Sequence, residues 1–493
     1  MSYIFFNPCY QLRQDGNRVI LYGKEDNEYQ SEDWFSFIHP FHAMMFSFFD
    51  GREKSECEIK KMAHFFSLPY DECVSIVNSY VNCSQKCLYS DGDYYFFPKN
   101  VLIEQNKPLE NRVFTYEVSD FRIDGKPDLI TMRTHFPVSI NLELTMKCYV
   151  DCCYCYANRK IQSNGQMTTT DIVDLIKKAK ASGVLNFDIN GGEVLMHPGI
   201  YDIISTLHEC GYQPLISTKI PVDFKILHKL KSCGVSRFQI SLDSVDEGVL
   251  KCMVKAPSGY VEAMSRTLSE ATSMHLKVAI NVVLTIYNCK VAVIRQLFDF
   301  LSLFSCIDAV RLNVCGYSIY KGSANYYKIR PSQNSISSIE SFTASDYCKK
   351  YSFKIHISGY EKQCLYESSD SKKESFEHRS ICTGNLRNLV ILPNGDVTIC
   401  EELYDNPHFI IGNVLQSSLE DIWNSDKALK LFYNPCSNIS KSACYDCDIY
   451  NQCRSHVGVC WKSVLMAYGD ENWDFPDPRC PKAPFPFNEF FIK

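Results

Sequence analysis

Apolar runs alternate with amphipathic segments through the middle of the chain. Strand-like runs recur at residues 138–144, 184–190, 214–217, 237–242, 277–285 and 309–314. The segments between them have a helical period, and in 171–179 the apolar positions share one face behind a threonine-rich start suited to capping. Six β/α units in succession predict a parallel sheet with helices outside it.

The first hundred residues follow a different pattern. Extended segments at 7–13 and 17–22 flank the sequence Gln14-Asp15-Gly16, which is typical of a hairpin turn. Helical segments at 40–50, 54–66 and 70–82 and an extended wing at 94–97 come next. This order predicts a winged-helix-like domain over residues 1–100.

Two further stretches connect these parts. Residues 101–135 have the pattern of a linker, and the serine-rich stretch 322–345 that of a loop with some helix. We expect the serine-rich loop to lie near the mouth of the α/β domain.

Composition narrows the class of protein. At 493 residues with 45% hydrophobic content, the chain should form two to four ordinary domains. Its 25 cysteines are too many for inert thiols, and the chain is too long for a small disulfide scaffold. No signal-like segment or apolar run of about 18 residues is present, so we expect a cytoplasmic protein without a membrane partner. A net charge of -6 without basic tracts argues against a nucleic-acid partner.

Three cysteines in one short loop carry the strongest chemical signal. Cys148, Cys152 and Cys155 have the spacing C-x3-C-x2-C. A [4Fe-4S] cube normally takes four thiolates, so three leave one iron open for reaction. Cys153 also permits the spacing C-x4-C-x-C, and we interpret it as a bystander. A structural zinc site is the alternative, since a CxxC pair alone is a common zinc motif.

A second motif follows the next predicted strand. Gly191-Gly192-Glu193 places two glycines where a backbone can approach a ligand without a Cβ in the way. Together with the cysteine loop and the aromatic Tyr154 before its last cysteine, this turn resembles the signature of the radical S-adenosylmethionine (SAM) enzymes.

The resemblance implies a fold and a cofactor site. The fold would be a partial (β/α)6 TIM-like barrel over residues 136–345, with its chemistry at the C-terminal ends of the strands. SAM would chelate the open iron through its amino and carboxylate groups. The implied cofactor-binding residues are Tyr154, Gly191, Gly192, Glu193, Ser217, Lys219, Ser241 and Asp243.

Some of these positions leave alternatives open. Lys219 departs from the Thr-Asn-Gly-like turn that the family often has there. Its ammonium could pair with the SAM carboxylate, or it could be a solvated surface side chain. Ser241 and Asp243 match a pattern that the family uses near the SAM ribose and methionine groups. Asn281 and Arg311 are weaker candidates, because inward polar residues also satisfy one another.

The last part of the chain, 346–493, carries a second set of cysteines and resembles the SPASM extension, which holds two auxiliary [4Fe-4S] clusters. The gap between Cys453 and Cys460 is six residues where the family usually has three. The resemblance assigns Cys444, Cys447, Cys453 and Cys480 to an outer cluster, and Cys382, Cys400 and Cys460 to an inner one. The inner fourth position is open or filled by another cysteine such as Cys436. Zinc ribbons are the alternative.

The N-terminal pattern resembles the leader-recognition domain of peptide-maturing enzymes, which is related to the peptide chaperone of pyrroloquinoline quinone biosynthesis. Such domains add a precursor's leader as a strand to an open sheet edge. A DNA-binding winged helix is the alternative, which the acidic balance disfavours.

The resemblances imply a radical SAM/SPASM maturase that acts on a ribosomally made precursor peptide, with SAM, three [4Fe-4S] clusters and a reductant such as flavodoxin or ferredoxin. We expect a 5′-deoxyadenosyl radical to initiate a crosslink, foremost a cysteine-to-carbon thioether as in sactipeptides and ranthipeptides. An aromatic carbon–carbon or ether crosslink is the near alternative. A sulfatase-type formylglycine maturase is another, in which Glu401 after Cys400 would be the catalytic base. A non-enzymatic leader-binding adaptor conflicts with the intact motifs.

Overall fold

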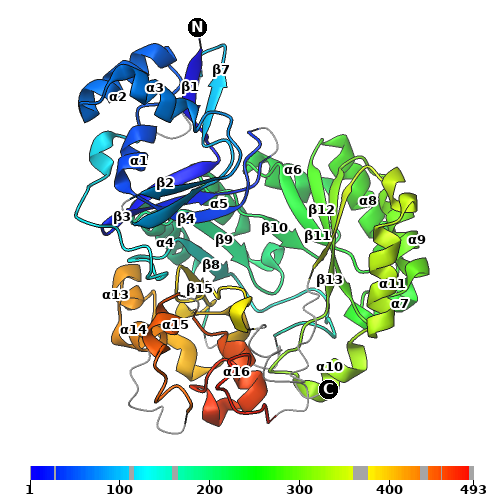
Figure 1. Cartoon of the computed structure of the whole chain (residues 1–493). Helices are drawn as coiled ribbons and strands as arrows, with labels where there is room; N and C mark the ends of the chain where they lie inside the picture. Colours follow the sequence, from blue (N-terminus) through cyan, green and yellow to red (C-terminus); the bar gives the residue numbers. More distant parts are fainter. Residues whose placement is uncertain are drawn as a thin grey trace. The chain divides into compact units, whose positions relative to one another are not determined.

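The computed structural model describes residues 2–26, 29–90, 92–109, 116–157, 165–358, 376–433, 442–456 and 458–487. The chain forms two compact units, Met1–Phe136 and Pro137–Lys493. Each is an α/β structure with its own core (Figure 1). No helix in the described ranges is both long enough and apolar enough to cross a membrane.

The N-terminal unit contains the hairpin, the three helices and the wing that the sequence predicts. Its strands are β1 (Tyr3–Phe6), β2 (Tyr10–Asp15), β3 (Arg18–Gly23), β4 (Trp34–Ile38), β5 (Lys86–Ser90), β6 (Asp93–Phe97) and β7 (Leu102–Gln105). Its helices are α1 (Pro40–Phe46), α2 (Ser55–Phe66) and α3 (Tyr70–Asn78). The strands pair in the order β2-β3-β4, with separate antiparallel pairs β5-β6 and β1-β7.

Residues beyond 100 belong structurally to this unit, although their pattern predicts a linker. The guanidinium of Arg18, only 1% exposed, donates hydrogen bonds to the carbonyls of Asp128 (2.6 Å), Thr131 (2.6 Å) and Arg133 (2.9 Å). It also forms an ion pair with buried Asp15 at 3.0 Å. A buried charge bonded in this way fixes the segment that surrounds it.

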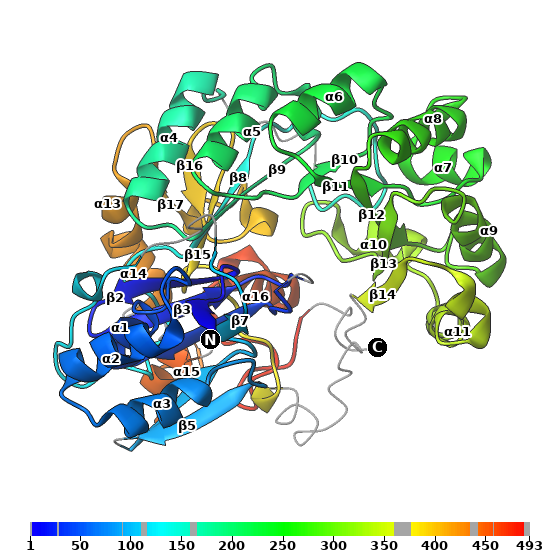
Figure 2. The ribbon, with the colours of Figure 1, turned by 90° about the horizontal axis from the view of Figure 1, so that it is seen from above.

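The C-terminal unit contains the barrel. Its strands run as β8 (Ser139–Glu143), β9 (Asn186–Asn190), β10 (Ile216–Thr218), β11 (Arg237–Ser241), β12 (Lys277–Leu284), β13 (Ile307–Val314) and β14 (Lys354–Ser358). The outer helices are α4 (Thr169–Ala181), α5 (Ile200–Glu209), α6 (Phe224–Ser232), α7 (Glu247–Val254), α8 (Tyr260–Ser273), α9 (Val291–Leu301) and α11 (Gln333–Thr343). All strand pairs from β10 to β14 and between β8 and β9 are parallel. The predicted partial barrel is confirmed, and Figure 2 shows the helices along its outer side.

The barrel strands have an apolar and a polar face. On β8, Ile140 and Leu142 are buried, while Ser139, Asn141 and Glu143 occupy the alternate positions. Asn186 on β9 donates to Ser139 (3.0 Å), which places the polar residues of both strands on the same side. Because successive side chains of a strand point to opposite faces, the apolar set packs under the helices and the polar set faces the interior.

Two parts of this unit differ from the sequence expectation. The stretch 322–345 is mainly helical, with α10 (Gly322–Ile329) and α11, because Ser332 caps the second helix through a bond to the Ser335 amide. The strand β15 (Asn388–Ile391) pairs in parallel with β8, and β16 (Asp396–Thr398) and β17 (Ile410–Asn413) extend the sheet antiparallel. The cysteine-rich domain thus continues the sheet of the barrel.

The remaining helices belong to the cysteine-rich domain. They are α13 (Leu419–Trp423), α14 (Asp426–Tyr433), α15 (Tyr450–His456) and α16 (Trp461–Tyr468). Trp423 is fully buried, and Trp461 packs against Phe409 and Trp473.

Candidate active site

The cysteine loop follows β8 and is held on several sides. The amides of Asp151 and Cys153 donate to the carbonyls of Val254 and Met253 at the end of α7 (3.0 and 2.8 Å). From the α10 region, Lys321 donates to the carbonyl of Cys152 (3.0 Å). Contacts from separate elements therefore position the loop.

The Gly-Gly-Glu turn after β9 clamps the other side of the loop. The amide of Gly192 donates to the carbonyl of Thr145 (2.6 Å), and that of Glu193 donates to the carbonyl of Lys147 (2.7 Å). A Cβ on Gly192 would lie 2.0 Å from the Lys147 oxygen, and Gly191 has a φ of +125°. The glycines therefore allow two protein backbones to meet, whereas the sequence predicts that they make room for a ligand.

Glu193 links this turn to the next strand. Its carboxylate, which is 2% exposed, accepts hydrogen bonds from the Thr218 hydroxyl and the Lys219 amide, both at 2.9 Å. Burial raises the pKa of Glu193, and these bonds oppose the rise. The carboxyl ends of β9 and β10 are joined through this one side chain.

A buried ionic network lies at the ends of β10 and β11. The Lys219 ammonium donates to Asp243 (2.9 Å) and to the Tyr154 hydroxyl (2.7 Å), and that hydroxyl donates to Asp243 (2.5 Å). The side chain of Lys219 is 13% exposed, so it is not a solvated surface lysine. Burial opposes its charge, but Asp243 and Cys152 outweigh burial and raise the pKa of Lys219.

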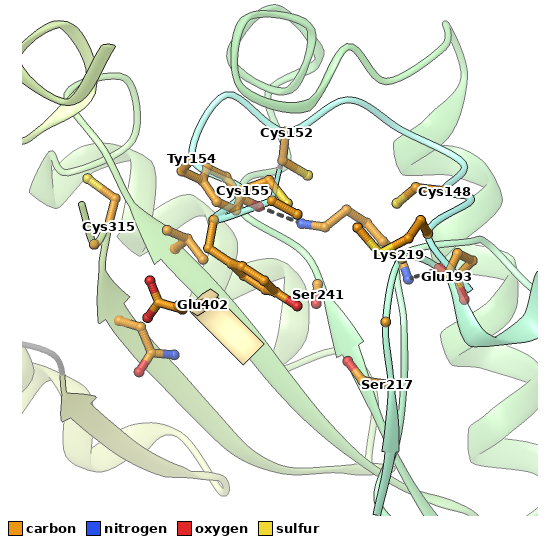
Figure 3. Close-up of a pocket in the computed structure, with 18 of the residues that line it drawn as sticks. Cys148, Cys152, Tyr154, Cys155, Glu193, Ser217, Lys219, Ser241, Cys315 and Glu402 are labelled. Atoms are coloured by element: carbon orange, nitrogen blue, oxygen red, sulfur yellow. Dashed lines mark hydrogen bonds between the residues drawn. The ribbon is translucent and has the colours of Figure 1, made fainter. Parts of the chain in front are cut away.

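These groups surround a cavity of about 400 Å³. Within the described residues no three histidine, cysteine or acidic side chains converge on a single ion position. The three loop cysteines are spread along the cavity wall instead, together with Tyr154, Glu193 and Lys219 (Figure 3). The other predicted residues that line it are Gly191, Gly192, Ser217 and Ser241. Asp243 does not line the cavity, but its carboxylate binds the ammonium of Lys219, which does.

Cys153 lies apart from the other three loop cysteines. It packs against an apolar cluster that contains Cys315, Tyr326 and Ile329. Its carbonyl accepts a hydrogen bond from Asn325 at 3.2 Å. This placement favours the interpretation of Cys153 as a bystander.

Several cavity residues were not foreseen from the sequence. Glu402 and Lys462, which form an ion pair, reach the cavity from the cysteine-rich domain. Asn313 and Cys315 line it from the end of β13. The strand-end rule could have identified these last two, whereas no local motif marks the ion pair. Asn281 bonds Asn313 instead of lining the cavity, and Arg311 is exposed.

Glu401 contacts the barrel strands and does not line the cavity. Its carboxylate accepts from the amide groups of Asn141 (3.3 Å) and Asn190 (3.1 Å) on β8 and β9. Burial, and then neighbouring Glu402, raise the pKa of Glu401. It is Glu402, the next residue, that lines the cavity.

The cysteines of the C-terminal domain fall into two groups. Burial raises the pKa of Cys382 to about 11, and the neighbouring Cys460 adds to this rise. Burial is also the largest cause of the raised pKa of Cys400, to which Cys382 contributes. Burial likewise raises the pKa of Cys480, to which Cys444 and Cys453 contribute. These mutual effects place Cys382, Cys400 and Cys460 in one neighbourhood and Cys444, Cys453 and Cys480 in another. Cys436 lies outside the described residues.

Cationic side chains contact the sulfurs of Cys444, Cys447 and Cys453. Arg379 donates to the sulfur of Cys453 (3.5 Å), Arg454 to that of Cys444 (3.8 Å) and Lys482 to that of Cys447 (3.7 Å). Hydrogen bonds to thiolate sulfur tune iron–sulfur centres. These three cationic residues were not foreseen from the sequence.

The donor sets fit iron–sulfur clusters. Burial raises the pKa of Cys152 to about 11, so its thiol keeps its proton at neutral pH unless a cation binds. Metal binding deprotonates such thiols. Three loop sulfurs, a backbone-clamped turn and a cavity beside them match the requirements of a cluster with a second ligand.

Comparison with known proteins agrees with this geometry. Residues 142–288 match the radical SAM superfamily, and residues 382–448 match the SPASM iron–sulfur cluster-binding domain. A probable GTP 3′,8-cyclase of Methanococcus aeolicus is 28% identical over 180 residues, which are 33% of this chain and 59% of the cyclase. The mycofactocin maturase MftC of Mycobacterium ulcerans is 23% identical over 366 residues, which are 70% of this chain and 88% of that protein.

Solved structures show the same fold. Streptococcus suis SuiB bound to precursor peptide SuiA superposes with a TM-score of 0.61 at 16% identity, covering 97% of this chain and 99% of SuiB. The family matches imply bound SAM and [4Fe-4S] clusters. With its barrel, cysteine loop and cysteine-rich extension, the chain carries a radical SAM domain at residues 142–288 and a SPASM domain at residues 382–448.

Proposed function

We propose that the enzyme installs a crosslink, foremost a cysteine-to-carbon thioether, in a ribosomally synthesised precursor peptide. The observation that carries the proposal is that the same chain has a radical SAM cavity and a separate N-terminal unit, whose three-stranded sheet ends at the edge strand β4. Two relatives named as peptide enzymes support it, the mycofactocin maturase and a PqqA peptide cyclase of Bradyrhizobium diazoefficiens. The cyclase is 25% identical over 189 residues, which are 37% of this chain and 47% of the cyclase.

The cofactor complement would be SAM with three [4Fe-4S] clusters. Cys148, Cys152 and Cys155 would hold the SAM-binding cluster. The auxiliary clusters would be held by Cys382, Cys400 and Cys460 and by Cys444, Cys447, Cys453 and Cys480. When bound and reduced by a donor such as flavodoxin or ferredoxin, the first cluster and SAM supply a 5′-deoxyadenosyl radical that removes hydrogen from a peptide carbon.

The protein would position the reacting groups. Glu193 and the Lys219–Asp243–Tyr154 network fix the carboxyl ends of β9, β10 and β11. Lys219 lines the cavity while paired to Asp243, so it presents a positive charge that an anionic group of SAM can share. The Glu402–Lys462 pair lets the SPASM domain form part of the same wall, which places both domains around one reaction space.

The N-terminal unit would bind the leader. In its three-stranded sheet, β4 is an edge strand that pairs with β3. The opposite edge, β2, is bonded by later residues, with the Leu12 amide donating to the Tyr116 hydroxyl (2.9 Å) and Arg13 to the Phe136 carbonyl (2.8 Å). An added strand would therefore pair with β4.

Exposed aromatic side chains lie near that edge. Tyr89, Tyr94 and Phe96 on the β5-β6 hairpin are each at least 50% exposed, and Ser36 on β4 donates to the Phe96 carbonyl (2.8 Å). Apolar leader side chains would pack against this aromatic surface while the leader backbone pairs with the strand.

Mass spectrometry tests the reaction. A thioether or carbon–carbon link removes two hydrogens, about 2 Da, and resists thiol reductants, unlike a disulfide. After reduction and alkylation, one unalkylated cysteine should accompany each such loss. Full alkylation with the same loss would instead support the aromatic crosslink, and a formylglycine product would support the sulfatase-type maturase and overturn the proposal.

Leader recognition has its own test. A variant that lacks residues 1–136 removes the whole compact unit, whereas a cut at residue 82 would divide it and expose β7. Precursor binding should fall strongly while substrate-free SAM cleavage continues. Equal processing of full-length and leaderless peptide by the intact enzyme would refute leader binding.

A further inference from the structure

A fully buried carboxyl group lies beside the active-site cavity and has no cationic partner among the described residues. Glu143, at the end of β8, is 0% exposed. One carboxylate oxygen accepts a hydrogen bond from the Tyr156 hydroxyl at 2.8 Å, and Tyr156 lines the cavity. The other oxygen, Oε2, is buried and has no hydrogen-bond partner among the described residues. Glu143 is therefore linked to the reaction space through a single phenol.

The surroundings of Glu143 favour proton exchange near neutrality. The titratable groups that act on it are Tyr156, from the segment after the cysteine loop, and Glu401, from the turn after β16. Burial, and then the like charge of Glu401, raise the pKa of Glu143 to about 7 against the opposing Tyr156 bond. A base of this strength suits a proton transfer at neutral pH.

We propose that Glu143 accepts, through the Tyr156 hydroxyl, the proton that the substrate loses when the new bond forms. The inference rests on the proposed crosslinking function and deepens it. In the balanced step the substrate gives one hydrogen atom to the deoxyadenosyl radical, one electron to an oxidised iron–sulfur cluster and one proton to Tyr156. As the phenol takes up this proton, it passes its own to the Glu143 carboxylate. The balance is the same for a thioether and for a carbon–carbon link.

Neighbouring carboxylates are less suited to this role. Glu401 already accepts from Asn141 and Asn190, and it does not line the cavity. Glu402 does line it, but its carboxylate is already paired with the Lys462 ammonium. Only Glu143 combines an oxygen without a partner, among the described residues, with a hydroxyl link to the cavity.

The variant Glu143→Gln tests the assignment, because glutamine keeps an acceptor for Tyr156 but takes up no proton. Crosslinking should slow about 100-fold, the lower end of general-base effects. Precursor-dependent formation of 5′-deoxyadenosine, and deuterium transfer to it from labelled peptide, should continue. Tyr156→Phe should give the same uncoupling. Asp188→Asn is the matched control, since Asp188 is an inward carboxylate of β9 that bonds Asn186 at 2.6 Å and does not line the cavity.

Two further readouts separate a proton acceptor from a structural residue. The wild-type crosslinking rate should rise with pH through about 7, as the carboxylate form appears, and the Glu143→Gln rate should lack this limb. Infrared difference spectra of the cluster-loaded, substrate-free enzyme should show a protonated carboxyl band that disappears over the same pH range and is absent in the variant.

The outcomes are distinct. If wild-type enzyme leaves the peptide unmodified, the proposed function fails. If it crosslinks the peptide and Glu143→Gln matches it at every pH, the proton-acceptor role is overturned. An equal loss of crosslinking and of deuterium transfer would also overturn it, because the defect would then precede bond formation. If Glu401→Gln alone uncouples the two steps, the role belongs to Glu401.

Discussion

Gly192→Ala should disrupt the SAM-cluster site although it adds a single methyl group. The new Cβ would lie 2.0 Å from the carbonyl oxygen of Lys147 and 2.9 Å from the carbonyl carbon of Met146. Both are backbone atoms, so the turn and the cysteine loop must separate by about 1 Å or more to reach normal contact. The separation would strain the Gly192–Thr145 and Glu193–Lys147 bonds, which measure 2.6 and 2.7 Å.

The cost can be estimated from these contacts. Overpacking a rigid site costs about 1–3 kcal/mol, and each lost backbone hydrogen bond about 1 kcal/mol. If the whole cost of about 3 kcal/mol falls on the conformation in which the turn clamps the cysteine loop, cluster retention and SAM affinity weaken about 150-fold. Anaerobically reconstituted Gly192→Ala should therefore lose about a third of its iron and cleave SAM poorly.

Gly316→Ala is the matched control for iron content. Gly316 lines the same cavity, but a Cβ there meets no atom within 4 Å. This variant should keep wild-type iron in the absence of SAM and peptide. Wild-type iron and SAM affinity in Gly192→Ala would refute the clamp, and equal losses in both variants would show that the cavity tolerates no added methyl group for another reason.

Three other predictions concern iron, charge and pH. Wild-type enzyme should hold about twelve irons. Changing Cys148, Cys152 and Cys155 together to alanine should remove about a third of them and abolish SAM cleavage. Zinc in place of iron in freshly purified anaerobic protein would contradict this prediction. Lys219→Met should destabilise the C-terminal unit by about 3 kcal/mol in urea unfolding, because it leaves the Asp243 carboxylate buried without its cation. The double variant Lys219→Met, Asp243→Asn should recover part of this loss. Additive losses in the double variant would contradict the coupling of the two residues. Burial raises the pKa of Glu58 from 4.5 to about 8, so folding favours its protonated form. The N-terminal unit should therefore lose stability as pH rises toward 8. Glu58→Gln should flatten this dependence of the melting temperature on pH, and an unchanged dependence would contradict the prediction.

The sequence predicts the repeated elements well because their signals are local. The apolar runs match the observed strands β8 to β13, and the capping threonine before α4 bonds the Asp171 amide as its motif requires. In contrast, β15 is short and pairs with Ser139–Glu143, which lies far back along the chain. No local pattern specifies such pairing.

The candidate site shows the same division. The spacing of the loop cysteines and the Gly-Gly-Glu turn identifies residues that the fold brings to one cavity. Which of the adjacent residues Glu401 and Glu402 faces that cavity depends on the direction of one short turn, and spacing does not encode it. The same holds for Lys219, whose partner Asp243 lies on another strand end.

The parallel pairing of β15 with β8 has a consequence for how such enzymes diversify. The strand that carries the cysteine loop has β9 on one side and a strand of the SPASM domain on the other. Exchanging the C-terminal domain at the linear boundary near residue 346 would leave the edge of β8 exposed and its polar inner face unsupported. Recombination between relatives should therefore succeed only where the incoming segment brings its own matching β15, so the two domains should be inherited together even when their substrates change.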